Sequence, residues 1–257
     1  SEKIVKIDED TTKLRNLTLP YMLVSGTGIV NIDGNRISFT DADKQLIFIT
    51  GAINFKKGGD YDDNPIAYIY IPHLDVRSQG RDMAFMFYRC SDLTSLNVTG
   101  FDTSAVTSME SMFNGCSNLT SLDLTGFNTS AVTNMDNMFN SCWKLASLDL
   151  SSFNTSAVTS MRSMFESCHD LTSLDLTGFD TSAVTNINSM FTDCSKLTSL
   201  DLSSFNTSAV TSMGYMFYNC SKLTSLDLTG FNTSAVTNMD SMFCRCSSLT
   251  SFDVTRF

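Results

Sequence analysis

The sequence predicts an α/β solenoid, in which a parallel β-sheet and short helices arise from stacked repeats, preceded by a small β-rich N-terminal cap. Three observations predict it. One 26-residue unit recurs over most of the 257 residues, the apolar spacing changes inside each unit, and strand-like runs precede the first unit. With 42% hydrophobic residues, including 19 Phe and 14 Met, the chain has enough apolar material for a continuous core.

The repeat is plainest in the cysteines, which recur every 26 residues. The unit reads MxxMFxxCxxLTSLDLTGFNTSAVTN. We call each copy a rung and each set of equivalent residues a column. The rungs begin at Met83, Met109, Met135, Met161, Ile187, Met213 and Met239, and their cysteines are Cys90, Cys116, Cys142, Cys168, Cys194, Cys220 and Cys246. Spacing this regular predicts that each residue lies against its own counterpart in the next rung.

Inside a rung, the apolar spacing predicts two kinds of element. In the second rung, the apolar residues of Met109–Cys116 fall at i, i+3, i+4 and i+7, which predicts a short helix. The leucines of Leu119–Leu124 follow as LxxLxL, which predicts a strand with one buried face, and Asn128–Ser130 is a polar turn. Elements this short are unstable alone, so the rungs must stack.

The chain divides into a β-rich N-terminal cap, residues 1–65, and a repeat region, residues 66–257. Ile66, Ile69, Ile71 and Leu74 reproduce the later spacing with a shift of 27, so 66–80 is interpreted as a degenerate rung before seven 26-residue rungs, the last incomplete. The cap covers the first apolar layer, although an independent binding domain is the alternative.

Asp33-Gly34-Asn35 predicts a hairpin. The strand-like runs are Tyr21–Ser25, Gly28–Ile32, Arg36–Thr40, Gln45–Phe55 and Ile66–Ile71.

At the other end, the sequence stops at Phe257, just after the predicted strand of the last rung. Two interpretations stay open. The chain is a fragment of a longer protein, which we favour, or its open end is a docking surface for another chain, including end-to-end or C-terminal docking to further repeats.

The LxxLxL strand, with MFxxC before it and a Phe-Asn/Asp-Thr-Ser turn after it, resembles the BspA-like leucine-rich-repeat surface proteins over about Arg81 to Phe257. The resemblance implies a leucine-rich-repeat-like solenoid, display outside a microbial cell, attachment to host or neighbouring-cell proteins, and no catalysis. Phe127 and its equivalents stand where an Asn or Cys often closes the turn, so the usual asparagine ladder is not expected.

Charge and composition exclude several classes of function. The formal net charge is −10, which disfavours nucleic acid and anionic lipid as partners. No apolar run approaches the roughly 18 to 20 residues of a membrane-spanning helix, so no membrane insertion is expected of this chain. His73 and His169 are the only two histidines, which leaves little material for a zinc site or a nucleophile–base pair, so no enzyme activity is expected.

Aspartates occupy one outward position of consecutive predicted strands. They form a column of like charges roughly 4.8 Å apart, which is expected to raise some carboxylate pKa values or to attract cations. The functional interpretation is a binding site for Ca²⁺ or a basic protein surface; the favoured alternative is a solvated face that prevents sheet association. The column is Asp123, Asp149, Asp175, Asp201, Asp227 and Asp253.

The in-register cysteines are expected to be buried, reduced thiols. Their Cβ atoms would lie about 5 Å apart, beyond the roughly 3.8 Å of a disulfide. Cys244 lies off this ladder and is either an exposed reactive thiol or an accident of the last rung. Trp143 and His169 interrupt a uniform column and are candidate specificity positions, though neutral drift explains them as well.

The first hypothesis is a secreted or cell-surface adhesin-type module that presents an acidic, hydroxyl-rich repeat face to an extracellular protein or glycan. The second is a structural spacer or stalk that holds another domain away from the cell, which the uniformity of the rungs favours. A hydrolase would require carboxylate pairs at defined separations, whereas these carboxylates form only a periodic column. No cofactor is expected, and calcium at the aspartate column is the one candidate.

Overall fold

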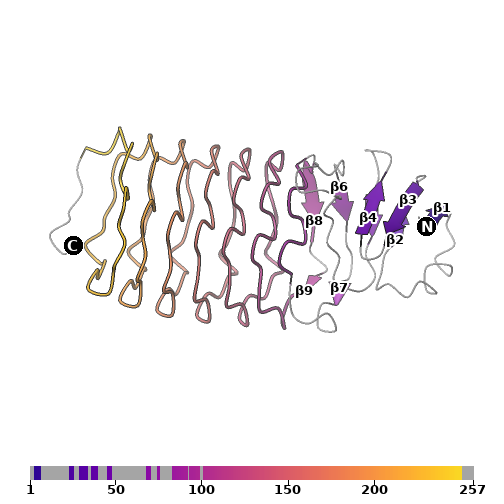
Figure 1. The fold of residues 1–257 in the computed structure, drawn as a ribbon, viewed down its shortest axis with the longest axis horizontal. Coiled ribbons are helices and arrows are strands. Elements are labelled where there is room, and N and C mark those ends of the chain that lie inside the picture. The colour runs from indigo at the N-terminus through magenta and orange to yellow at the C-terminus, as the bar shows by residue number, and fades with distance from the viewer. Residues whose placement is uncertain are drawn as a thin grey trace.

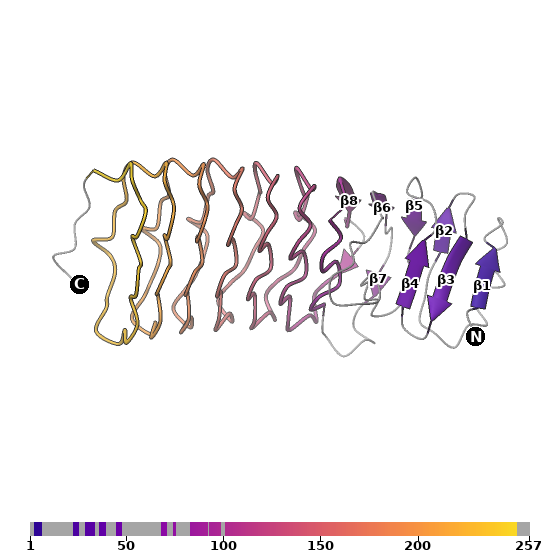
Figure 2. The ribbon, with the colours of Figure 1, turned by 45° about the horizontal axis from the view of Figure 1, so that its top comes forward.

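The structure is a computed structural model that describes residues 3–6, 23–25, 29–33, 36–39, 45–47, 68–70, 74–75, 83–91, 93–98 and 101–250. The rungs lie side by side along one long axis, with the N-terminal strands at one end (Figure 1). A second view shows the same single row (Figure 2). No helix long and apolar enough to cross a bilayer occurs among these residues.

The first strands form an antiparallel sheet in the order β1-β3-β4. These strands are β1 (Lys3–Lys6), β3 (Ile29–Asp33) and β4 (Arg36–Phe39). Asp33 pairs with Arg36 in antiparallel register, so the hairpin that the sequence predicts between β3 and β4 is confirmed. Each of the five predicted strand-like runs contains a strand, whereas β1 was not predicted.

A second sheet joins this region to the rungs, in the order β2-β5-β6-β8. Its strands are β2 (Leu23–Ser25), β5 (Gln45–Ile47), β6 (Tyr68–Tyr70) and β8 (Ser95–Asn97). Ile69 pairs in parallel with Leu96. Leu74 of β7 (Leu74–Asp75) pairs with Phe101 of β9 (Phe101–Asp102). Both registers have the 27-residue offset of the sequence pattern; the division into cap and solenoid stays a prediction.

The predicted helices are wrong for the described rungs. Residues 109–116 and their equivalents, which we call the turn segments, form consecutive tight turns. The Met112 N–H donates to the Met109 carbonyl at 3.2 Å, and the Cys116 N–H donates to the Phe113 carbonyl at 3.0 Å. Turns with a three-residue step place side chains on one side much as a helix does, so the apolar spacing did not separate the two.

Stacking explains why turns replace the helix. Alternate N–H groups of a turn segment leave the rung: Ser111 donates to the Asp136 carbonyl at 2.8 Å, and Phe113 donates to the Met138 carbonyl at 2.9 Å. In an α-helix these N–H groups would instead donate to carbonyls of the same helix and could not reach the next rung. Ser111 has φ 52° and Gly115 has φ 80°, the left-handed conformation that closes such turns. The turn segments are therefore the main backbone ladder between rungs.

The predicted parallel sheet on the LxxLxL segments is found at the N-terminal end, between β6 and β8, but not throughout the rungs. Within residues 103–250 the structure has only isolated parallel bridges, such as Ser108 with Asn134. On the leucine side, the bond from the Ala146 N–H to the Thr120 carbonyl measures 3.3 Å, longer than the bonds of the turn ladder. The predicted burial pattern nevertheless holds, because Leu122 and Leu124 are buried and Asp123 is exposed.

The core is a set of stacked columns. The rings of Phe139 and Phe165 lie with centroids 5.7 Å apart and planes 6° apart. The same stacking joins Phe87 to Phe113 and continues to Phe243. Leucine, methionine and cysteine columns are buried around these rings. Each rung thus covers the apolar layer of its neighbour.

Candidate functional site

The predicted aspartate column lies on the surface of the stack. We call Asp123, Asp149, Asp175, Asp201 and Asp227, which are all exposed, the acidic face. Asp253 lies outside the described residues. Each carboxylate is held by the residue two positions later. Asp175 accepts hydrogen bonds from the Thr177 N–H at 3.0 Å and from the Thr177 hydroxyl at 2.7 Å. The carboxylates therefore have fixed orientations.

These local bonds reverse the expected effect of the column on carboxylate pKa values. The expectation that repulsion raises them is wrong: the pKa of Asp175 lies below its ordinary value because the Thr177 N–H and hydroxyl stabilise the anion, and the charges of Asp201 and Asp149 oppose this less strongly. The pKa values of Asp123, Asp149 and Asp201 are lowered in the same way. A short-range bond outweighs a screened charge several ångströms away.

Four carboxylates of the acidic face are expected to stay ionised to low pH, namely Asp123, Asp149, Asp175 and Asp201. A folded-state pKa lowered below the unfolded value adds stability that is present above the unfolded pKa and is lost as pH falls through the folded pKa. We expect carboxyl NMR titration to place Asp175 below its ordinary 3.8, and Thr177→Val to move it back toward that value without moving Asp201. A wild-type pKa above 3.8 would contradict the geometry.

No cluster of three or more His, Cys, Asp or Glu side chains that could hold a metal ion occurs in the part of the chain that the structure describes. A carboxylate oxygen that already accepts hydrogen bonds from its own turn has fewer lone pairs left to coordinate a cation. Calcium at the aspartate column stays a prediction without geometric support.

The cysteine column lies inside the stack. Cys90, Cys116, Cys142, Cys168, Cys194 and Cys220 are free and buried, and Cys246 is half-buried. From Cys116 to Cys246, each thiol of the column donates to a carbonyl of the preceding rung, as Cys142 does to Phe113 at 3.2 Å. Burial raises the pKa of Cys142 and Cys194 to about 12. The cysteine column therefore contributes to core packing, and its thiols are not expected to act as nucleophiles.

Cys244 is the exposed member of the eight cysteines. Because the thiolate is the nucleophile, buried thiols with raised pKa react slowly. We expect one fast equivalent of thiol labelling at pH 8 in the native chain, lost in Cys244→Ser, and eight equivalents in denaturant. Fast labelling of Cys142 in the native chain, located by mass spectrometry, would contradict the burial of the ladder.

Trp143 and His169 lie in equivalent positions of adjacent rungs, where the other rungs have serine. Their rings are stacked, with centroids 6.2 Å apart and planes 16° apart. Trp143 is 51% exposed. The structure thus brings these two sequence-predicted positions together, in a column separate from that of the acidic face.

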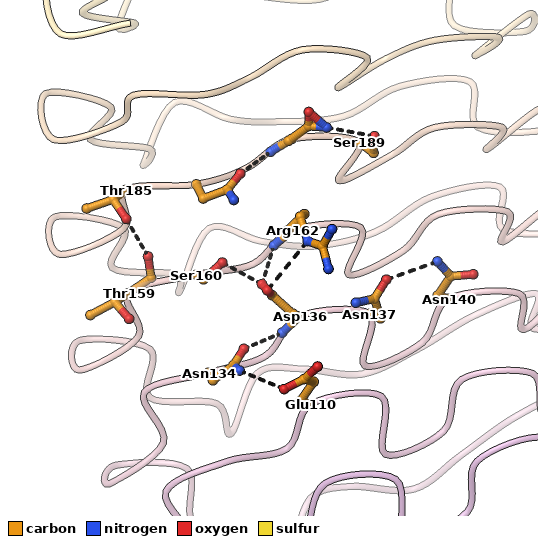
Figure 3. A network of polar contacts seen from close by, with 12 residues as sticks. Glu110, Asn134, Asp136, Asn137, Asn140, Thr159, Ser160, Arg162, Thr185 and Ser189 are labelled. Carbon is orange, nitrogen blue, oxygen red and sulfur yellow. Dashed lines mark hydrogen bonds and ion pairs between the residues drawn. The ribbon is translucent and has the colours of Figure 1, made fainter. Parts of the chain in front are cut away.

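A polar network that the sequence analysis missed lies on the turn segments and on the residue before each of them (Figure 3). Asp136 accepts hydrogen bonds from the Ser160 hydroxyl and from the Arg162 N–H, the latter at 2.8 Å. The Asn134 amide donates to Glu110 at 3.1 Å. This network ties successive rungs together. Side chains there differ from rung to rung, whereas the acidic face is uniform.

The turns of successive rungs are joined by a ladder of threonines. The sequence analysis did not expect the asparagine ladder that is usual in leucine-rich repeats, and it did not predict this threonine ladder. The buried Thr129 hydroxyl donates to the Asn154 carbonyl at 2.9 Å and accepts from the Asn154 N–H at 2.8 Å. The equivalent buried threonines are Thr103, Thr155, Thr181 and Thr207. The sequence analysis missed this role because threonine in an Asn-Thr-Ser turn resembles a solvated turn residue. Its identity in every rung was the available signal.

The fold and repeat define a leucine-rich-repeat solenoid. A leucine-rich-repeat protein of T. pallidum matches with TM-score 0.52 and 20% identity, over 80% of this chain and 84% of that one. A leucine-rich-repeat protein of Bacteroides ovatus matches with TM-score 0.40 and 16% identity, over 92% and 70%. No curated protein matches the chain.

The chain belongs to the family described as "Mycoplasma protein of unknown function, DUF285", whose model matches residues 81–199 and 168–256. These matches cover the rungs with the cysteine and phenylalanine columns. The repeat region is therefore what relates this chain to its family.

Proposed function

We propose that this protein is a non-catalytic, extracellular binding module of the adhesin type, displayed on a microbial surface or secreted. Its acidic face contacts a basic patch on an extracellular protein. One observation carries the proposal: five exposed carboxylates, Asp123 to Asp227, follow the stack in one column, each oriented by its own turn. A fixed array of one charge sign favours encounter with a complementary surface.

The experiment compares two double variants of equal charge change against a panel of purified basic matrix proteins. Asp149→Asn/Asp175→Asn removes two charges from the acidic face. Asp102→Asn/Asp180→Asn removes two from the Asn-Thr-Ser turns, where other rungs already have Asn128. Asparagine keeps the local acceptor, as Asn154 shows with the Ser156 N–H at 3.1 Å, so both variants should fold.

The first variant is expected to weaken binding at least about tenfold and to lower its salt dependence, while the turn variant changes it little. Equal losses would show that net charge alone acts, and would overturn the acidic face as the contact surface.

A spacer or stalk is the second candidate, favoured by the near-parallel phenylalanine stack that runs unbroken from Phe87 to Phe243. Such a stack suits a stiff rod. If no panel protein binds with an affinity that the acidic-face variant changes, the spacer is the better description.

A further inference from the structure

We infer that the Trp143–His169 pair is a saccharide-binding subsite, in which a sugar ring packs on the aromatic pair and hydrogen-bonds to the polar side chains around it. The inference rests on the proposed binding-module function and names a ligand class for a second surface. The acidic face is not part of it.

At this pair, two adjacent rungs depart from a column that is otherwise uniform. Its column otherwise contains only serine: Ser91, Ser117, Ser195, Ser221 and Ser247. Two adjacent rungs replace a small polar side chain with aromatic rings that stack with planes 16° apart. Ala146, three residues after Trp143, is exposed and stands where the other rungs have threonine. Two serine positions and one threonine position of these rungs thus lack their hydroxyl group, and the two serine positions hold stacked aromatic rings instead.

Charged side chains of both signs follow the two aromatic residues in the chain. Lys144 follows Trp143 in the chain, and its ammonium donates to Asn118 at 2.7 Å. Asp170 follows His169 and pairs with Lys196 at 2.8 Å. The Asp170 N–H also donates to the Trp143 carbonyl at 3.0 Å, which ties the two rungs at this position. Ammonium, carboxylate and amide groups supply the donors and acceptors that a sugar's hydroxyl groups require.

The distribution of exposed apolar side chains favours a saccharide over a protein here. Among the described residues, the exposed large hydrophobic side chains are Phe85, Trp143 and Tyr215, which belong to the first, third and sixth rungs. They therefore form no contiguous apolar patch of the size that a protein interface buries. A sugar ring has an apolar C–H face and a hydroxyl rim, so one aromatic platform with polar neighbours matches its size and chemistry.

Trp143 is the single tryptophan of the chain, so intrinsic fluorescence reports on this site directly. The probes are chitotriose, lactose and maltotriose, titrated into the full chain. We expect at least one to give a saturable change in emission, with a dissociation constant of about 0.1 to 1 mM, typical of weak binding at an open site.

Variants identify the site, with the binding of the same probe measured by calorimetry. Trp143→Ser and His169→Ser restore the serine of the other rungs, so both should fold; the first is expected to abolish binding and the second to weaken it about fivefold or more. Tyr215→Ser is the matched control, because Tyr215 is an exposed aromatic in a column that contains Ser111, Ser163 and Ser189. It should leave the affinity unchanged.

No saturable response to any of the three probes would overturn the inference, as would calorimetric binding that Trp143→Ser leaves intact. Loss of protein binding in Trp143→Ser without any saccharide response would assign the pair to a protein partner instead. Asp149→Asn/Asp175→Asn separates the two proposals. It should leave saccharide affinity unchanged, so failure of the acidic face and failure of the aromatic pair give different results.

Discussion

Replacing Phe165 by alanine is expected to lower the free energy of unfolding by about 3 to 5 kcal/mol. The ring is fully buried and lies between Phe139 and Phe191, with both centroid distances 5.7 Å. Alanine would remove contacts on both sides and leave a cavity that the repeated backbone ladder prevents from collapsing. Because each rung contacts only its neighbours, the loss would weaken the coupling between the two halves of the stack.

Urea unfolding followed by circular dichroism and by Trp143 fluorescence would measure this effect. Phe165→Leu keeps most of the volume and should cost under about 1.5 kcal/mol. Phe243→Ala provides a positional control, since Phe243 is half-buried in the last rung and stacks on Phe217. If Phe165→Ala cost no more than Phe243→Ala, the stacked column would not be the main source of stability.

The sequence was sufficient to predict what the repeat interval determines. A strict 26-residue interval means that neighbouring rungs present the same residue at the same place, which is how Phe113 meets Phe139. The apolar spacing of the degenerate rung also predicted the 27-residue offset by which Ile69 pairs with Leu96. These relations follow from geometry alone, whatever the local conformation of each segment.

The backbone conformation within each rung was harder to predict from the sequence. Residues 109–116 have the apolar spacing of a helix, yet their N–H groups are shared between their own turns and the next rung. Apolar spacing reports which side chains are buried, not where backbone donors go. The same limitation applies to Leu122 and Leu124, which are buried as predicted without forming a strand ladder in their rung.

The sequence was sufficient to predict where the acidic face lies, but not the pKa values of its carboxylates. The exposure of Asp175 follows from its alternation with leucine, but the direction of its pKa shift depends on Thr177, two residues later. An Asp-x-Thr or Asp-x-Ser pattern was visible in the sequence and signals this local bond. The Trp143–His169 stack followed from the interval, whereas its polar neighbours depend on side-chain orientations that no spacing determines.

Replacing Thr129 by valine should have the second large effect, because one hydroxyl group satisfies two backbone groups of the next rung. The Thr129 side chain is fully buried, and its oxygen bonds both the N–H and the carbonyl of Asn154. Valine has almost the same shape, so packing is retained while both backbone groups lose their partner. An unsatisfied buried polar group costs roughly 1 to 3 kcal/mol, so we expect a loss of about 2 to 5 kcal/mol.

Thr129→Ser is the matched control. It keeps the hydroxyl and removes one methyl group, so it should cost about 1 kcal/mol. Hydrogen exchange supplies the specific readout: the Asn154 amide should lose protection in Thr129→Val and keep it in Thr129→Ser. Equal unfolding free energies for the two variants would mean that the methyl group, rather than the bridging hydroxyl, stabilises this turn. In that case the threonine column would be ordinary packing, and the turn ladder from Ser111 to Asp136 and its equivalents would be the main set of hydrogen bonds between the rungs.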